Sequence, residues 1–95
     1  MPEMWFRLRW PDGRQETCYS PSTAIADYFE PGARYPLAEF LERSRAGLGA
    51  ASERVRARYG MPCSRALGQL ARIEEAAKRY TDAPEAVVTV EGIEP

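Results

Sequence analysis

The sequence has 95 residues, of which 44% are hydrophobic and 28% are charged, and its formal net charge is −1. This composition excludes a disordered chain, because disordered segments combine low hydrophobicity with high net charge. The balanced charge argues against a dedicated nucleic-acid binder, since phosphate contacts normally require a basic excess. We expect a single domain over residues 1–95, near the lower size limit for a self-sufficient core.

The sequence contains no histidine and only two cysteines, Cys18 and Cys63. The lack of histidine excludes Ser-His and Cys-His catalytic pairs and histidine metal ligands. Two distant cysteines without a CxxC motif predict reduced thiols and neither a metal nor another cofactor. No apolar run approaches the roughly 20 residues of a membrane helix, and the first residues do not resemble a signal peptide. We therefore expect a cytoplasmic protein without membrane attachment.

Residues 3–10 alternate between apolar and other side chains, which predicts a half-buried strand. Residues 11–13, Pro-Asp-Gly, favour a three-residue hairpin loop into a second strand, with a two-residue Asp-Gly loop as the alternative. The longer loop turns Cys18 toward the core and places Trp5 opposite Tyr19 on the other face. The shorter loop would turn Tyr19 inward instead. We prefer the longer loop because it buries the thiol and pairs the two aromatic side chains.

Ser20 followed by proline predicts the start of a short helix that ends near Phe29. A long helix is predicted over residues 37–59, between Pro36 and the terminating Gly60. Its apolar stripe comprises Leu37, Phe40, Leu41, Leu48, Ala51, Val55 and Tyr59. Gly47 and Gly49 interrupt this helix, but the apolar phase is the same on both sides of them. We therefore predict one continuous helix, in which the glycines allow the close approach of a neighbouring element.

A second long helix is predicted over residues 64–80, and the short turn before it favours an antiparallel helical hairpin. Its apolar face comprises Ala66, Leu67, Leu70, Ile73, Ala77 and Tyr80. Residues 86–90 are rich in β-branched side chains and predict a last strand, followed by a frayed tail over residues 91–95.

The element order β-β-α-α-α-β predicts a two-layer α+β domain. We expect a three-stranded sheet in the order 2-1-3, with the helical hairpin on one face. The direction of the last strand stays open.

The two thiols are candidates for a reactive group. Cys63 precedes a predicted helix, where the helix dipole lowers the pKa of a thiol. It also matches the apolar face, so a small buried hydrophobe is the stronger interpretation. Cys18 lies in a strand and is the weaker candidate.

Arginines gather along the predicted helical hairpin and form a second candidate surface for an anion or an acidic partner. This surface comprises Arg43, Arg54, Arg56 and Arg58, with Arg45 and Arg65 nearby. Glutamates at positions 39, 42 and 53 lie among them, so a solvated face with salt bridges is the stronger interpretation.

The main candidate surface is the sheet face that the helices leave uncovered. In the preferred register it carries Trp5, Arg7, Arg9, Thr17 and Tyr19. Exposed aromatic residues beside arginines are typical of protein interfaces. The simpler interpretation, which we weigh equally, is a cross-strand Trp5–Tyr19 pair without a partner. Stacking of single-stranded nucleic acid on this face ranks below both.

Four phrases of the sequence together resemble one small bacterial family, that of the nitrogen starvation response proteins. They are RWPDG at residues 9–13, CYSPS at 18–22, PG…YPLAEF at 31–40 and ASERVRARYG at 51–60. The resemblance covers nearly the whole chain and implies a physiological setting without any catalytic residue. Its members are encoded beside a nitrilase-family hydrolase, a radical SAM protein, an acetyltransferase and a flavin oxidoreductase. That cluster is linked to nitrogen limitation and to growth on cyanide or nitriles.

We therefore expect a non-enzymatic protein that binds or regulates protein partners from this gene cluster. The alternative is a small-molecule-binding or thiol-dependent enzyme of the same pathway, which would rely on Cys18 or Cys63. A nucleic-acid-binding regulator is the third possibility. The oligomeric state stays open.

Overall fold

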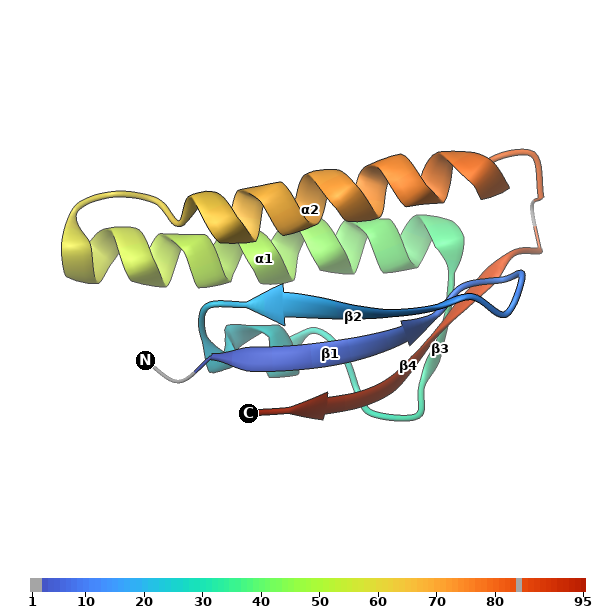
Figure 1. Cartoon of the computed structure of the whole chain (residues 1–95), viewed down its shortest axis with the longest axis horizontal. Helices are drawn as coiled ribbons and strands as arrows, with labels where there is room; N and C mark the ends of the chain where they lie inside the picture. The colour runs from blue at the N-terminus through green and yellow to red at the C-terminus, as the bar shows by residue number, and fades with distance from the viewer. Residues whose placement is uncertain (1–2, 84) are drawn as a thin grey trace.

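The computed structural model describes residues 3–83 and 85–95, which form a layer of helices over a β-sheet (Figure 1). The strands are β1 (Met4–Arg9), β2 (Gln15–Ser20), β3 (Arg34–Pro36) and β4 (Val87–Glu94). The helices are α1 (Leu37–Tyr59) and α2 (Ser64–Ala77), with short 3₁₀ turns η1 (Thr23–Asp27) and η2 (Lys78–Tyr80). The α+β class is confirmed.

The hairpin that joins β1 and β2 has the predicted three-residue loop. Gly13 adopts a left-handed φ of 90°, and the Trp10 N–H donates to the Arg14 carbonyl over 2.8 Å. Trp5 consequently lies opposite Tyr19, and Cys18 is buried in the core. This register is confirmed because Pro and Gly meet the φ requirements of the longer loop at their respective positions.

The sheet has four antiparallel strands in the order β2-β1-β4-β3, so the prediction of three strands was wrong. The missing strand, β3, has three residues and ends in Pro36. A strand this short gives almost no periodicity, and proline cannot donate to a ladder, so such a segment is found only at a sheet edge. The predicted neighbourhood of the first and last strands is confirmed, and their direction is antiparallel.

β4 extends to Glu94, so the prediction of a frayed tail after Val90 was wrong. The strand contains an irregularity opposite Arg7 and Leu8, where Val90 pairs with Leu8 but Gly92 pairs with Arg7. The additional residue between them, Glu91, forms a bulge and shifts the alternation of the strand by one position. Because of this shift the next apolar side chain faces the core, although simple alternation would place it outside.

α1 spans the predicted residues 37–59, and Gly60 ends it with a left-handed φ of 85°. α2 ends at Ala77, where the chain tightens into the 3₁₀ turn η2, so α2 is shorter than predicted. The predicted helix from Ser20 to Phe29 was wrong: β2 includes Ser20, and only the five-residue turn η1 follows. Ser22 caps this turn by accepting a hydrogen bond from the Ala24 N–H over 3.1 Å.

α1 covers one face of the sheet and buries a continuous apolar cluster. Its centre comprises Phe6, Leu8, Trp10, Cys18, Ile25, Phe29, Phe40, Leu48, Ile73, Val88 and Val90. Among the residues predicted for the two apolar faces, Tyr59 at the end of α1 and Leu67 on α2 are exposed. Tyr59 matches the apolar stripe of α1, but the end of this helix extends past the strands that would cover it (Figure 1).

α2 packs against α1 and lies beside the edge strand β2. The prediction that the whole helical hairpin covers one face of the sheet was therefore wrong for α2. The Tyr19 N–H of β2 donates to the Gln69 side-chain oxygen of α2 over 3.0 Å. A helix in this position protects the edge of the sheet from pairing with another chain. No helix in the described part of the chain is long and apolar enough to cross a membrane.

Candidate functional site

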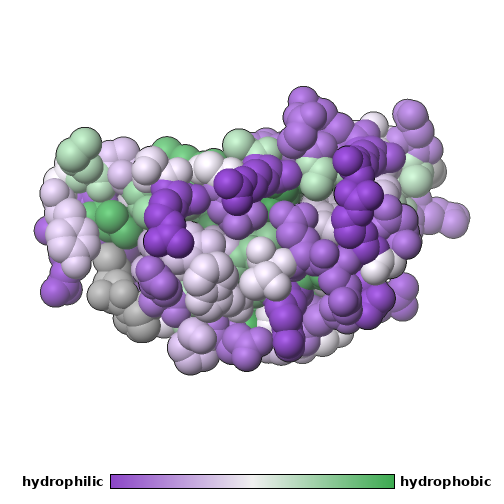
Figure 2. Space-filling view, in the orientation of Figure 1, coloured by the Kyte–Doolittle hydropathy of each residue, from purple (hydrophilic) through white to green (hydrophobic). Residues whose placement is uncertain are grey.

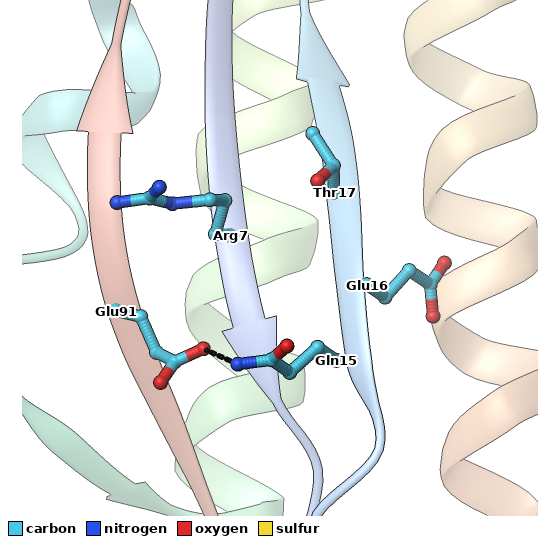
Figure 3. Close-up of a pocket in the computed structure, with 5 residues that line it drawn as sticks. All are labelled: Arg7, Gln15, Glu16, Thr17 and Glu91. Atoms are coloured by element: carbon cyan, nitrogen blue, oxygen red, sulfur yellow. Dashed lines mark hydrogen bonds between the residues drawn. The ribbon is translucent and has the colours of Figure 1, made fainter.

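In the described part of the chain no helix covers the sheet face opposite α1, and Figure 3 views this face with α1 behind the strands. We call this surface the open face. It comprises Trp5, Arg7 and Arg9 of β1, Gln15 and Thr17 of β2, and Thr89, Glu91, Gly92 and Glu94 of β4. The structure thus brings together four of the five predicted residues. Hydrophilic side chains also dominate the view in Figure 2, where hydrophobic areas are small and separate.

Charged side chains on the open face form pairs between β1 and β4. Arg9 Nε lies 3.0 Å from the Glu91 carboxylate, and the Gln15 amide donates to the same carboxylate over 3.0 Å (Figure 3). Arg7 lies 3.4 Å from the Glu94 carboxylate. Exposed pairs of this kind contribute little stability. They do give the face a defined pattern of alternating charge.

Gly92 determines where the Arg7 side chain lies. A Cβ atom at position 92 would collide with Nη2 of Arg7, because the guanidinium group lies directly over the glycine. Gly92 is buried beneath this contact, whereas Arg7 remains exposed. The glycine therefore allows the arginine to lie along the sheet and reach Glu94.

A shallow polar pocket of about 440 Å³ opens on this face. It is lined by Arg7, Gln15, Glu16, Thr17 and Glu91 (Figure 3). The Glu91 carboxylate already accepts hydrogen bonds from two neighbours. Glu16 accepts one from the buried Trp10 indole over 3.0 Å. This arrangement suits recognition of a polar surface more than proton transfer, because both carboxylates already accept hydrogen bonds from neighbouring side chains.

The two aromatic residues predicted for this face differ in exposure. Trp5 is 36% exposed, but Tyr19 is only 9% exposed. Their rings meet edge to face at 5.3 Å, which confirms the predicted cross-strand pair. The Arg65 guanidinium of α2 lies 3.9 Å above the Tyr19 ring and covers it. The expectation that Tyr19 contributes an exposed surface was therefore wrong, because α2 reaches around the β2 edge.

The structure places the two thiols in different surroundings. Cys18 is fully buried, and burial raises the pKa of its thiol, with the Glu16 charge adding to this effect and Arg72 opposing it. Cys63 is half-buried before α2, and its N–H donates to the Ser52 hydroxyl over 3.1 Å. The described residues contain no cluster of three or more potential metal ligands.

The arginines of the second candidate surface do not converge. Arg43 pairs with Glu39 at 3.0 Å and donates to the Tyr28 carbonyl over 2.8 Å. Arg54 contacts the Thr23 hydroxyl, Arg56 pairs with Glu53, and Arg58 lies over the ring of Tyr59. Each guanidinium has a different local partner, so the structure favours a solvated helix surface here.

Sequence reasoning missed the β4 contribution to the open face, because residues 91–95 were expected to fray. The alternation of Val88 and Val90 breaks at Glu91-Gly92 and resumes with Ile93. A glycine at such a break is the usual sequence mark of a bulge. That pattern would have indicated a longer strand and, with it, the two carboxylates that pair with the β1 arginines.

A family model described as "Nitrogen starvation-induced protein NitG" matches residues 5–93. The chain belongs to this family. The match covers all of the helices and strands except the terminal residues Met4 of β1 and Glu94 of β4, and it includes the open-face residues from Trp5 to Gly92. The predicted resemblance to nitrogen starvation proteins is thereby confirmed. No curated protein and no solved structure matches the chain.

Proposed function

We propose that this NitG-family protein is a non-enzymatic accessory protein that binds a protein partner through the open face during nitrogen starvation. The observation that carries the proposal is the uncovered sheet face with an exposed indole beside a fixed pattern of charge. The partner suited to it is a protein surface of mixed charge with an apolar contact for Trp5. Aromatic and arginine side chains of this kind contribute most of the affinity in many interfaces.

The enzymes encoded beside the family in bacterial nitrile and cyanide assimilation clusters are the partners we propose, in the cytoplasm. The alternatives have less support. Burial of Cys18 weakens a thiol-dependent activity. Two carboxylates, Glu91 and Glu94, lie beside the open-face arginines and weaken nucleic-acid binding, because they would repel phosphate groups.

A pull-down with these enzymes tests the proposal. Wild-type protein should retain at least one of them, and the double substitution Trp5→Ala/Arg7→Ala should reduce recovery at least about tenfold, as loss of central interface residues does. Arg56→Ala is the matched control, because it removes an exposed, paired arginine from α1. The control should bind like wild type. Equal recovery by wild type and the double variant would contradict the proposal.

The substitution Gly92→Ala is an independent test of the proposal, because it removes no side chain from the open face. The added methyl group displaces the Arg7 guanidinium and separates it from Glu94. We expect weaker partner recovery, with a melting temperature within a few degrees of wild type, since the arginine end can move into solvent. If displacement of Arg7 leaves recovery unchanged, the charge pattern has no part in recognition.

A further inference from the structure

A second recess, separate from the pocket on the open face, lies between the edge strand β2 and helix α2. We call it the edge groove. It has a volume of about 440 Å³, and its lining includes Trp5, Tyr19, Arg65, Gly68, Gln69 and Arg72. The α2 residues Arg65, Gly68, Gln69 and Arg72 have the spacing i, i+3, i+4, i+7, so they lie on the same side of the helix. The groove therefore forms only because α2 lies beside the β2 edge.

Gln69 lines this groove and has a hydrogen-bond donor without a partner in the described part of the chain. The side chain is 6% exposed, and its oxygen accepts the Tyr19 N–H over 3.0 Å. That bond assigns the oxygen to the strand and leaves the amide nitrogen Nε2 buried, with no partner among the described residues. A buried donor without an acceptor is costly, so its presence favours a ligand that supplies an acceptor atom.

The charges around the groove favour an anionic acceptor. Arg72 forms no ion pair with any carboxylate in the described part of the chain. Arg65 is held over the Tyr19 ring, with Glu3 at 3.6 Å on its outer side. A carboxylate or phosphate oxygen can accept from a guanidinium group and an amide together, and such charge-assisted bonds are stronger than neutral ones.

Gly68 keeps the groove open. A Cβ atom at this position would meet nothing within 4 Å, so there is free space directly above the helix backbone. Trp5 lines the same groove and gives it an aromatic wall. An occupant thus has room for an apolar group beside its charged end.

We infer that the edge groove binds a small-molecule oxyanion, either a carboxylate or a phosphate, that carries an apolar group. Gln69 Nε2 and Arg72 donate to the oxyanion, and the apolar group contacts Trp5. The groove shares Trp5 with the open face, but Arg7 and its ion pair with Glu94 lie outside it, so substitutions at Arg7 and at Arg72 separate the two sites.

Nuclear magnetic resonance titration of the full chain tests the inference, with the Gln69 side-chain amide as reporter. The probes are benzoate, phenyl phosphate and the neutral analogue benzamide, at constant ionic strength. One of the two anions should shift the Gln69 amide signals in a saturable manner, and the stronger one identifies the source as carboxylate or phosphate. A response to benzamide equal to that of the anions, or no response to either anion, would overturn the inference.

Three variants assign the binding to the groove. Arg72→Ala should weaken anion binding at least about tenfold, as loss of a charge-assisted bond does. Gly68→Leu should abolish it by filling the groove, and it should not lower stability, since leucine favours helix more than glycine does. Arg7→Ala should bind the anion like wild type. Undiminished binding by Arg72→Ala or Gly68→Leu would place the anion elsewhere and overturn the inference, whatever the outcome of the partner pull-down.

Discussion

The role of Cys18 depends on its burial and not on the reactivity of its thiol. It lies in β2, packs in the core between the sheet and α1, and is fully buried. Burial disfavours the charged thiolate and therefore raises the pKa of the thiol. A thiolate nucleophile at this position would require water or a positive charge beside the sulfur. The residue acts as a small apolar side chain.

The raised pKa of Cys18 predicts a loss of stability at alkaline pH. The unfolded chain releases this proton near the ordinary pKa of 9.0, whereas the folded state retains it. The unfolded state then binds fewer protons, so the free energy of unfolding falls as pH rises above about 9. The contribution of one proton is up to about 1.4 kcal/mol per pH unit. Urea denaturation at pH 8, 9 and 10 measures it.

Cys18→Ala is the comparison for this prediction, studied in a Cys63→Ser background to remove the other thiol. The substitution lowers stability at every pH because it removes buried atoms, but it should flatten the decline between pH 9 and pH 10. The decline at higher pH includes Tyr19 and Tyr80, whose pKa values burial also raises. If the free energy of unfolding declined equally with pH in the two proteins, Cys18 would have the same pKa in the folded and the unfolded state.

At the scale of elements, the two glycines of α1, Gly47 and Gly49, have different surroundings. A Cβ atom on Gly47 would lie 2.7 Å from Cδ1 of Ile25, so η1 approaches the helix where a side chain is missing. A Cβ atom on Gly49 would meet nothing within 4 Å. The close approach predicted from the sequence is therefore confirmed at Gly47 and was wrong at Gly49.

Alanine substitution should separate these two glycines. Gly49→Ala should raise the free energy of unfolding by up to about 1 kcal/mol, because alanine favours helix more than glycine does. Gly47→Ala gains the same propensity but must displace the buried Ile25, and such overpacking costs about 1 to 3 kcal/mol. We expect Gly49→Ala to be the more stable variant by about 1 to 3 kcal/mol in urea denaturation, because the propensity gain is common to both. Equal stability would show that η1 does not pack on α1 at Gly47.

At the scale of the whole molecule, β4 is the last strand of the sequence but joins the first strand, β1, to β3 in one sheet. It lies between β1 and β3 and pairs with both. Its last half contributes Ile93 to the core and Glu91 and Glu94 to the open face. The bulge at Glu91 makes this division possible, because it returns an apolar side chain to the core side.

Ile93→Ala tests the extent of β4. Ile93 is half-buried against the core cluster, so its truncation should lower the free energy of unfolding by about 1 to 2 kcal/mol. Glu94→Ala is the adjacent control: its ion pair with Arg7 is exposed, and the change should stay within about 0.5 kcal/mol. Thermal and urea denaturation measure both. Indistinguishable effects of the two substitutions would indicate that residues 91–95 fray, as the sequence alone predicts.

Local sequence patterns were sufficient to predict the features that depend on neighbouring residues. The 3.6-residue period and Gly60 defined α1, and Pro-Asp-Gly defined the hairpin loop and its register. The absence of histidine excluded whole classes of catalytic site before any fold was known. These conclusions held because periodicity and turn chemistry act within a few residues of the chain.

The contacts on which the two proposed surfaces depend become visible only in the folded protein. Arg9 meets Glu91 across 82 positions of sequence, and Tyr19 meets Gln69 across 50. The first contact needs the bulged end of β4, and the second needs α2 to lie at the β2 edge. No local pattern specifies either arrangement, because each depends on how separate elements share one core. The open face and the edge groove are therefore properties of the packing, although every residue in them is visible in the sequence.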